Sequence, residues 1–243
     1  MESKFKKNSL AIIIPTYNEE KVAKDCIDAV MKVISQMKIK TKLIVINDGS
    51  KDKTPLILEE KQKEYYKHLV ILTHEKNKGY GAAVQSGTKK AMELGFDWGL
   101  HMDSDLTNDP KYIPFFAKDM SGKYDCIKAS RYIKGAMTVN VPMYRQLISQ
   151  IGNYIASMFF NIGIKDCTNG FRMVRLALLN GIKFKENNFS IILEELYYLK
   201  KKGAMFKEIP YRLTARTSSI SHFSYQPKTF YNYFKYLVKA AFV

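Results

Sequence analysis

Short apolar segments alternate with amphipathic ones along the first half of the chain. The apolar segments are rich in Ile, Val and Leu, a composition typical of buried strands. They predict strands at residues 10–14, 42–47, 70–73, 98–102 and 126–130. Between them, apolar residues recur at helical spacing and predict helices at 19–36, 55–66 and 82–94. This alternation predicts an α/β fold, with a mostly parallel sheet flanked by helices.

The pattern changes after residue 130. A long helix is predicted at 143–162, with an apolar side and a side that carries Gln, Ser and Asn. Another helix is predicted at 190–202, followed by Gly203, a residue that favours helix C-termini. A strand is predicted at 206–214. The chain contains no internal repeat and no low-complexity linker.

The last segment, residues 227–243, has an amphipathic helical pattern with basic residues on its polar side. One face carries Phe230, Phe234, Leu237 and Ala241, and the other carries Lys228, Asn232, Lys235 and Lys239. Such a helix is typical of a membrane interface, and the alternative is an ordinary helix docked on the domain. We therefore expect one domain over residues 1–226 and a helical appendage over 227–243.

Composition and charge narrow the classes of partner. Hydrophobic residues make up 46% of the 243 positions and charged residues 26%, which excludes a disordered or fibrous chain. Lys and Arg exceed Asp and Glu by 39 to 23, a net charge of +16 that favours nucleic acid, nucleotides or anionic lipid as partners. The three cysteines, Cys26, Cys126 and Cys167, are widely spaced, which argues against a disulfide framework and for a reducing compartment.

The sequence predicts attachment to a membrane surface rather than insertion. No stretch of 18 uninterrupted apolar residues occurs, and the apolar run near the N-terminus breaks at Pro15, too early for a signal peptide. We expect a cytoplasmic protein that is peripheral on the cytoplasmic face of a membrane.

Polar residues follow three of the predicted strands, where ligands of parallel α/β sheets bind. The first strand leads into Pro15–Glu19, the second into Asn47–Ser50, and the fourth into Asp103-Ser104-Asp105. The one-residue gap between the two aspartates points both carboxylates to the same side. Two hard oxygen ligands suit Mg²⁺ or Mn²⁺, which would bridge them to a diphosphate.

A glycine-containing turn, Lys78-Gly79-Tyr80-Gly81, precedes the third predicted helix. Glycine allows the backbone to approach a phosphate closely, and a helix N-terminus favours an anion, so Gly79 is a candidate donor-binding residue. The turn is not a Walker loop, and no G-x-G-x-x-G follows the first strand, so a Rossmann dinucleotide site is disfavoured.

The order of these motifs resembles the family 2 glycosyltransferases of the GT-A fold. The similarity is greatest to the polyprenyl-phosphate branch, which includes dolichol-phosphate mannose synthase and bacterial polyprenyl-phosphate glycosyltransferases. It covers about residues 8–223. The motifs that carry it are PTYNE (15–19), NDGS (47–50), KGYGAA (78–83), MDSDLTNDP (102–110), SRY (130–132), DCTNGFR (166–172) and EIPYRLTAR (208–216).

The resemblance implies a role for each motif. Residues around the nucleotide base and ribose would be Pro15, Tyr17, Glu19 and Asp48. The metal and diphosphate pair would be Asp103 and Asp105. Arginines near the donor diphosphate and acceptor phosphate would be Arg131, Arg172 and Arg216, since a guanidinium bonds two phosphate oxygens at once. The loop that shapes the sugar site would be Asp166, Thr168, Asn169 and Gly170, with Glu194 on the helix beneath it.

Three positions depart from the family pattern. Asn47 replaces the first of two aspartates, which leaves Asp48. Thr107 stands two residues beyond the metal pair, where relatives often have Gln, and is a poorer third ligand. After Arg216, Ser221 and His222 stand where relatives tend to have Ser-Lys, and a protonated histidine would still meet a phosphate.

The resemblance implies an inverting enzyme that moves a sugar from a UDP- or GDP-sugar to a polyprenyl phosphate. Because that nucleophile is already an anion, no general base is required, and catalysis means positioning and charge neutralisation by a metal and by Asp105, Arg131 and Arg216. The main alternative is a sugar hydroxyl acceptor, which needs a carboxylate base such as Glu194.

Two remote alternatives belong to other classes. A sugar nucleotidyltransferase would have a glycine-rich, arginine-containing loop after the first strand, where this chain has PTYNEEK. A nucleic-acid-binding module would account for the charge, but the lysines are spread along the chain and no binding motif is present. We therefore expect no nucleic acid partner.

Overall fold

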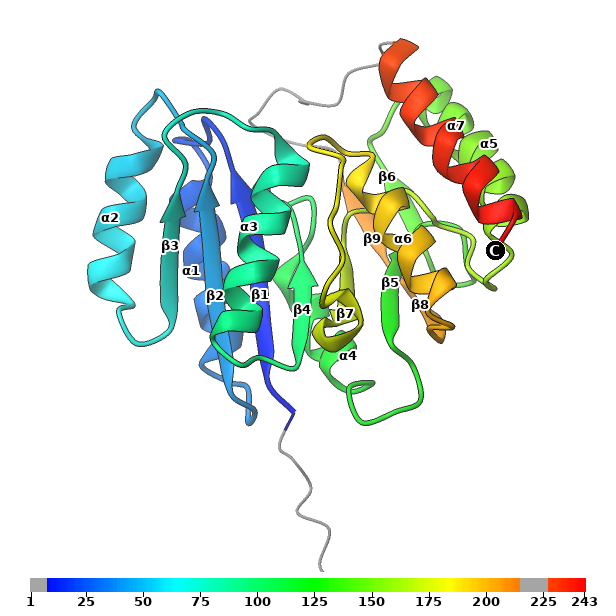
Figure 1. The fold of residues 1–243 in the computed structure, drawn as a ribbon. Coiled ribbons are helices and arrows are strands. Elements are labelled where there is room, and N and C mark those ends of the chain that lie inside the picture. Colours follow the sequence, from blue (N-terminus) through cyan, green and yellow to red (C-terminus); the bar gives the residue numbers. More distant parts are fainter. Residues whose placement is uncertain (1–7, 215–226) are drawn as a thin grey trace, which may run out of the picture.

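The computed structural model describes residues 8–214 and 227–243, with side chains of the last segment described from Tyr231 onward (Figure 1). The first half of the chain alternates strands and helices as the sequence predicts. Its elements are β1 (Leu10–Thr16), α1 (Ala23–Ile34), β2 (Thr41–Asn47), α2 (Thr54–Glu64), β3 (Leu69–Thr73), α3 (Tyr80–Glu93) and β4 (Trp98–His101). The strands lie parallel in the order β3-β2-β1-β4, so their carboxyl ends meet at one edge.

The second half extends the sheet and adds the helices α4 to α7. Its elements are α4 (Ile113–Ala117), β5 (Cys126–Ser130), β6 (Met137–Val139), α5 (Met143–Phe160), β7 (Arg172–Arg175), α6 (Ile191–Lys201), β8 (Phe206–Pro210), β9 (Arg212–Thr214) and α7 (Pro227–Ala241), with 3₁₀ turns at Pro110–Tyr112 and Leu176–Leu179. The sheet order is β3-β2-β1-β4-β7-β5-β8, and β6 pairs with β9 in a small second sheet.

Strand β7 was not predicted from the sequence. It is antiparallel to both β4 and β5, and it has arginine at each end, so no apolar run marks it. The prediction of one strand at 206–214 is wrong: the chain breaks at Tyr211, and β8 pairs with β5 whereas β9 pairs with β6. Pro210 ends β8, and the Tyr211 amide still donates to the Ser130 carbonyl.

The sheet is covered on both faces. Alternate residues of β1 point to opposite sides, so Ile12 and Ile14 join one core and Ala11 and Ile13 join the other. Helix α3 packs closely on the second face, because a Cβ at Gly87 would lie 2.5 Å from the Ile13 side chain. The three cysteines are buried and unpaired with one another, as the sequence predicts.

Helix α7 lies beside α5 and packs against both α5 and α6 (Figure 1). From Tyr231 onward, its buried residues are Tyr236, Leu237 and Ala240, whereas Phe234 on the predicted apolar face is exposed. The buried face of α7 therefore differs from the apolar face that the sequence pattern predicts. Within the described part of the chain, no helix combines the length and the apolar content needed to cross a membrane.

Candidate active site

The carboxyl ends of β1 and β2, with the turn before α3, form a densely bonded region that we call the β1–β2 edge. It is built from Pro15–Glu19, Asn47–Ser50 and Lys78–Gly81. The Asn18 amide donates to Ser50 Oγ at 3.0 Å, and the Glu19 amide donates to Thr54 Oγ1 at 2.9 Å. The structure thus brings together four predicted nucleotide residues: Pro15, Tyr17, Glu19 and Asp48.

Asp48 is the centre of this edge. Its Oδ1 lies 2.6 Å from His74 Nδ1 and accepts from the Lys78 amide at 2.9 Å, and its Oδ2 accepts from the Gly79 amide at 2.8 Å. The carboxylate therefore fixes the turn before α3. Base recognition by Asp48 stays a prediction.

The structure gives a different reason for the glycines of this turn than phosphate approach. A Cβ at Gly79, where φ is +96°, would lie 2.4 Å from the Asn187 carbonyl oxygen, and one at Gly81 would lie 2.4 Å from the Glu186 carbonyl oxygen. The Gly81 amide also donates to the Asn187 carbonyl. The chain at 186–188 thus occupies the space beside the start of α3. Donor binding by Gly79 stays a prediction.

The aspartate pair follows β4, in a loop whose residues form hydrogen bonds with one another. Asp105 is buried, and its Oδ1 accepts from the Thr107 amide at 3.0 Å and from Thr107 Oγ1 at 2.7 Å. The Asp103 amide donates to Asn108 Oδ1 at 2.8 Å, and Tyr211 donates its hydroxyl to the Thr107 carbonyl. Loop geometry is therefore set by short-range bonds and by a tyrosine from the end of β8.

Asp103 and Asp105 are the residues that would hold a divalent metal. No cluster of three or more His, Cys, Asp or Glu side chains arranged for a metal occurs among the described residues. A magnesium site for nucleotides ordinarily takes one or two protein carboxylates and completes its shell with phosphate and water oxygens. The pair fits a metal of that kind, since a donor diphosphate would supply the remaining ligands.

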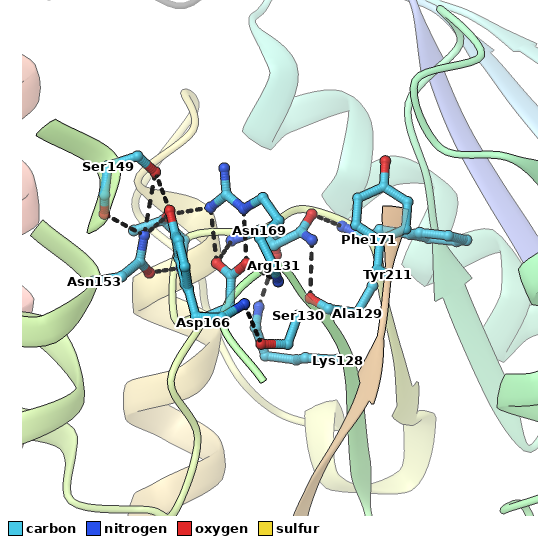
Figure 2. Close-up of polar contacts among 12 residues, drawn as sticks. Lys128, Ala129, Ser130, Arg131, Ser149, Asn153, Asp166, Asn169, Phe171 and Tyr211 are labelled. Atoms are coloured by element: carbon cyan, nitrogen blue, oxygen red, sulfur yellow. Dashed lines mark hydrogen bonds and ion pairs between the residues drawn. The ribbon is translucent and has the colours of Figure 1, made fainter. Parts of the chain in front are cut away.

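Arg131 is held by the loop that was predicted to shape the sugar site (Figure 2). Its Nε donates to Asp166 Oδ2 at 2.7 Å, and its Nη2 donates to Asp166 Oδ1 at 2.8 Å. Burial disfavours the charged guanidinium, but Asp166 outweighs it and raises the pKa of Arg131, so this group is a permanent cation. On the other side of the loop, the Asn153 amide group donates to Thr168 Oγ1 at 2.9 Å, which ties α5 to it.

Arg172 and Glu194 are both fully buried, and neither lines the large pocket described below. Arg172 pairs with Glu195, with Nε 2.5 Å from Oε1 and Nη2 3.0 Å from Oε2. The Glu194 carboxylate accepts from the backbone amides of Lys185 and Glu186 at 2.9–3.0 Å. In this structure the arginine supports the core below the site, and the glutamate caps a loop. Their predicted roles at the diphosphate and as a base stay predictions.

A pocket of about 1000 Å³ opens between the aspartate loop, Arg131 and helices α5 and α7. Polar and charged residues of its lining include Asp103, Thr107, Arg131, Thr168 and Asn169. Apolar side chains of its lining include Ile148, Ile155, Ile192, Leu213, Phe234 and Leu237. The pocket therefore combines charged groups with a large apolar surface.

Arg145 also lines this pocket, and the sequence interpretation missed it. It lies in the first turn of α5 and is the only charged residue of that 18-residue helix. A lone arginine in an otherwise uncharged helix was the signal that could have indicated it. Arg216, Ser221 and His222 lie outside the described residues, so their predicted roles stay predictions.

Comparison with known proteins agrees with the motif reading. The model of the family described as "Glycosyl transferase family 2" matches residues 11–182. A dolichol-phosphate mannosyltransferase of Pyrococcus furiosus is 27% identical over 95% of this chain, which spans 63% of that protein's length. A polyprenol monophosphomannose synthase of Mycolicibacterium smegmatis is 24% identical over 88% of this chain and 80% of its own length.

Solved structures support the fold class. The glucosyl-3-phosphoglycerate synthase of Mycobacterium tuberculosis, in complex with Mn²⁺, UDP and glucosyl-3-phosphoglycerate, superposes with a TM-score of 0.67 at 15% identity, covering 97% of this chain and 81% of that one. The same enzyme has been solved with Mg²⁺ and UDP. The α/β fold with a mostly parallel sheet between helices, as expected for GT-A proteins, is confirmed.

Proposed function

Because the chain belongs to glycosyl transferase family 2, we propose that it transfers a sugar from a nucleotide-diphosphate sugar to a polyprenyl phosphate with inversion at the anomeric carbon. The observation that supports this acceptor is the large pocket, whose lining combines the charged Asp103, Arg131 and Arg145 with apolar side chains of α5 and α7. A lipid phosphate has the same division into an anionic head and a hydrocarbon tail.

The donor would lie across the β1–β2 edge with its diphosphate near the aspartate loop. Asp103 and Asp105 would hold Mg²⁺ or Mn²⁺, which when bound neutralises charge on the departing diphosphate. Arg131, fixed by Asp166, would orient the acceptor phosphate, and Arg145 would bind it from α5. With an anionic nucleophile, the rate comes from alignment and charge compensation, so no residue has to remove a proton.

The outer face of α5 supports attachment to a membrane surface. The stripe formed by Leu147, Ile151, Tyr154 and Met158 is exposed and lies outside the pocket. The polar Gln146, Ser149 and Asn153 line the pocket instead. Ile148 and Ile155 of the same helix also line the pocket, so α5 carries apolar side chains toward the pocket as well as away from it. The exposed stripe suits the headgroup region of a bilayer, where a polyprenyl phosphate is found.

Product analysis tests the proposal. The protein is supplied with UDP- or GDP-sugars, Mn²⁺ and either polyprenyl phosphate in vesicles or soluble oligosaccharides. We expect a sugar-phospholipid with inverted configuration and loss of transfer in EDTA. A glycosylated hydroxyl as the sole product, at any lipid concentration, would contradict the proposed acceptor. Selective thermal stabilisation by one nucleotide sugar identifies the donor.

A further inference from the structure

Lys128 is a lysine in the middle of a buried strand. It lies on β5, opposite Arg172 of β7 and Glu208 of β8, and its side chain is fully buried. Moving an ammonium group out of water is strongly unfavourable unless other groups compensate. An apolar residue at this position would continue the strand at no such cost, so the lysine calls for an explanation beyond packing.

The Lys128 amine is not half of an ion pair. Its Nζ donates to the Asn169 carbonyl oxygen at 2.7 Å, and none of the salt bridges among the described residues includes it (Figure 2). The neighbouring Arg172 is already paired with Glu195. Burial and the charge of Arg172 hold the pKa of Lys128 below its ordinary value. The amine is therefore committed to one backbone carbonyl.

That carbonyl belongs to the wall of the proposed sugar site. Asn169 is fixed by further bonds, since its Nδ2 donates to the Ala129 carbonyl at 2.9 Å and its Oδ1 accepts from the Phe171 amide at 3.0 Å. The next residue, Gly170, faces the pocket, and a Cβ there would lie 3.8 Å from Asp103 Oδ1 and 2.9 Å from Tyr80 Oη. The 169–170 peptide thus bonds the amine through its carbonyl, and Gly170 on its other side lies near Asp103.

We infer that Lys128 is a positioning residue for donor binding: by bonding the Asn169 carbonyl, it sets the 169–170 peptide against Asp103 and shapes the wall that meets the donor's sugar diphosphate. The inference rests on the proposed function for the identity of the ligand. The bond to the carbonyl and the closeness of Gly170 to Asp103 are independent of that identity.

Two substitutions separate positioning from packing. Lys128→Met keeps the length of the side chain and removes the donor, and Lys128→Gln keeps an N–H donor on a shorter chain. We expect Lys128→Met to keep or raise the melting temperature, because a buried charge gives way to an apolar group, and to weaken donor affinity about tenfold. Lys128→Gln should lie between Lys128→Met and wild type in donor affinity.

The readouts are melting temperature, titration calorimetry with UDP- and GDP-sugars plus Mn²⁺, and hydrogen exchange of the amides at 168–172. Faster exchange there in Lys128→Met supports the assignment without reference to activity. The matched control is Lys61→Met, a buried lysine of α2 that pairs with Asp28 and Glu64, each at 2.7 Å. It should lower the melting temperature and leave donor affinity unchanged.

Unchanged donor affinity and unchanged exchange in both Lys128 variants would overturn the assignment. Failure of both variants to fold would also overturn it, because the role would then be structural. If wild type binds a nucleotide sugar but glycosylates no polyprenyl phosphate, the proposed acceptor is wrong, and donor affinity and exchange still decide the role of Lys128. If wild type binds no nucleotide sugar, the proposed function fails and exchange alone decides it.

Discussion

The β1–β2 edge and the large pocket are built by different means. At the edge, side chains bond to backbone amides of neighbouring turns, as Asp48 does to Lys78 and Gly79. In the pocket, walls come from segments far apart in the chain, and side-chain pairs join them, as Arg131 does with Asp166. Its outer helix, α5, exposes apolar residues on the opposite side.

The difference fits the two ligands proposed for these regions. A nucleotide has a fixed shape, and recognition of it gains from groups held rigidly by backbone bonds. A polyprenyl chain is long and variable, and needs an apolar surface with a phosphate anchor at one end. Substitutions at the edge should therefore change donor affinity, whereas substitutions in the pocket should change the use of the acceptor.

The largest effect is expected where the two regions meet, at the aspartate loop. Asp103→Asn and Asp105→Asn should each lower transfer by at least about 100-fold, since even outer-shell partners of a metal reach that size. The measurement is the transfer rate against Mn²⁺ concentration, with EDTA as the reference. Asp109→Asn is the control, because its carboxylate caps the 3₁₀ turn through the Lys111 amide and pairs with the Lys111 side chain at the surface. Full activity in excess EDTA would refute the metal site.

The two arginines of the pocket should differ in what their loss does. Arg131→Ala removes the partner of the buried Asp166 and should cost about 3–5 kcal/mol of unfolding free energy as well as activity. Arg145 lies on an exposed helix surface, so Arg145→Ala should keep the free energy of unfolding within about 0.5 kcal/mol of wild type. It should still lower transfer to polyprenyl phosphate about 10- to 100-fold, the value of a charge-assisted bond.

Chemical denaturation and acceptor titration measure both quantities. Equal loss of stability in the two variants would contradict the proposal that only Arg131 supports the fold. An unchanged acceptor KM in Arg145→Ala would contradict the proposal that Arg145 binds the acceptor.

These regions also differ in how far the sequence predicts them. The β1–β2 edge follows from local patterns, because each strand runs directly into its polar turn and parallel strands place those turns together. Asp48 and Asp103 were located in this way. The glycines of the turn were found from the sequence, but their close packing was not. The loop at 186–188, which fills the space beside Gly79 and Gly81, lies about a hundred residues away in the chain.

The pocket was less predictable because its parts meet only through tertiary packing. Strand β7 carries no apolar run, so the burial of Arg172 against Glu195 could not be read from the motif. Glu194 was expected near the reacting atoms, and its bonds to two backbone amides appear only once the loop before α6 is in place. Arg145 was missed because the helix was predicted from the spacing of its apolar residues, which gives no information about a single charged residue.

Glu194→Gln tests whether the pocket needs a base. The carboxylate accepts bonds from Lys185 and Glu186 amides, and an amide oxygen keeps part of that capacity. We expect a loss of about 1–2 kcal/mol in stability and less than about a threefold change in transfer, with an unchanged pH–rate profile near neutrality. A 10²- to 10⁴-fold slower rate in a folded variant would instead indicate a general base and a hydroxyl acceptor.

The outer face of α5 should contribute to membrane binding in small increments. Ile151→Glu replaces an exposed apolar residue of the stripe and should weaken binding to anionic vesicles about fivefold, because partial burial of such a side chain contributes roughly 1 kcal/mol. Leu56→Glu is the control, since Leu56 is also exposed but lies on α2, which flanks the far end of the sheet (Figure 1). Vesicle sedimentation measures both. Equal binding by the two variants would contradict the proposal that α5 contacts the membrane surface.

The smallest effect concerns the tether of α7 to the loop beside the glycine turn. Glu186 Oε1 accepts from Lys235 Nζ at 2.6 Å, and Oε2 accepts from Ser190 Oγ at 2.7 Å. Burial works against the charge of this carboxyl, but those hydrogen bonds outweigh it and hold the pKa of Glu186 below its ordinary value. A lowered folded-state pKa means that the stabilisation is complete above the unfolded-state pKa of about 4.3 and is lost as the pH falls through the folded-state value.

Glu186→Gln should therefore lower stability by about 1 kcal/mol at pH 7, and the difference from wild type should shrink below pH 4. Urea denaturation between pH 3 and pH 7 measures both, with the exposed Glu59→Gln as the control for general charge effects. Because the Gln85 side chain donates to the Glu186 carbonyl at 3.0 Å, the same loop contacts α3 of the β1–β2 edge. A change in donor affinity in Glu186→Gln would show that the two regions are coupled through this loop, and an unchanged affinity would show that they act independently.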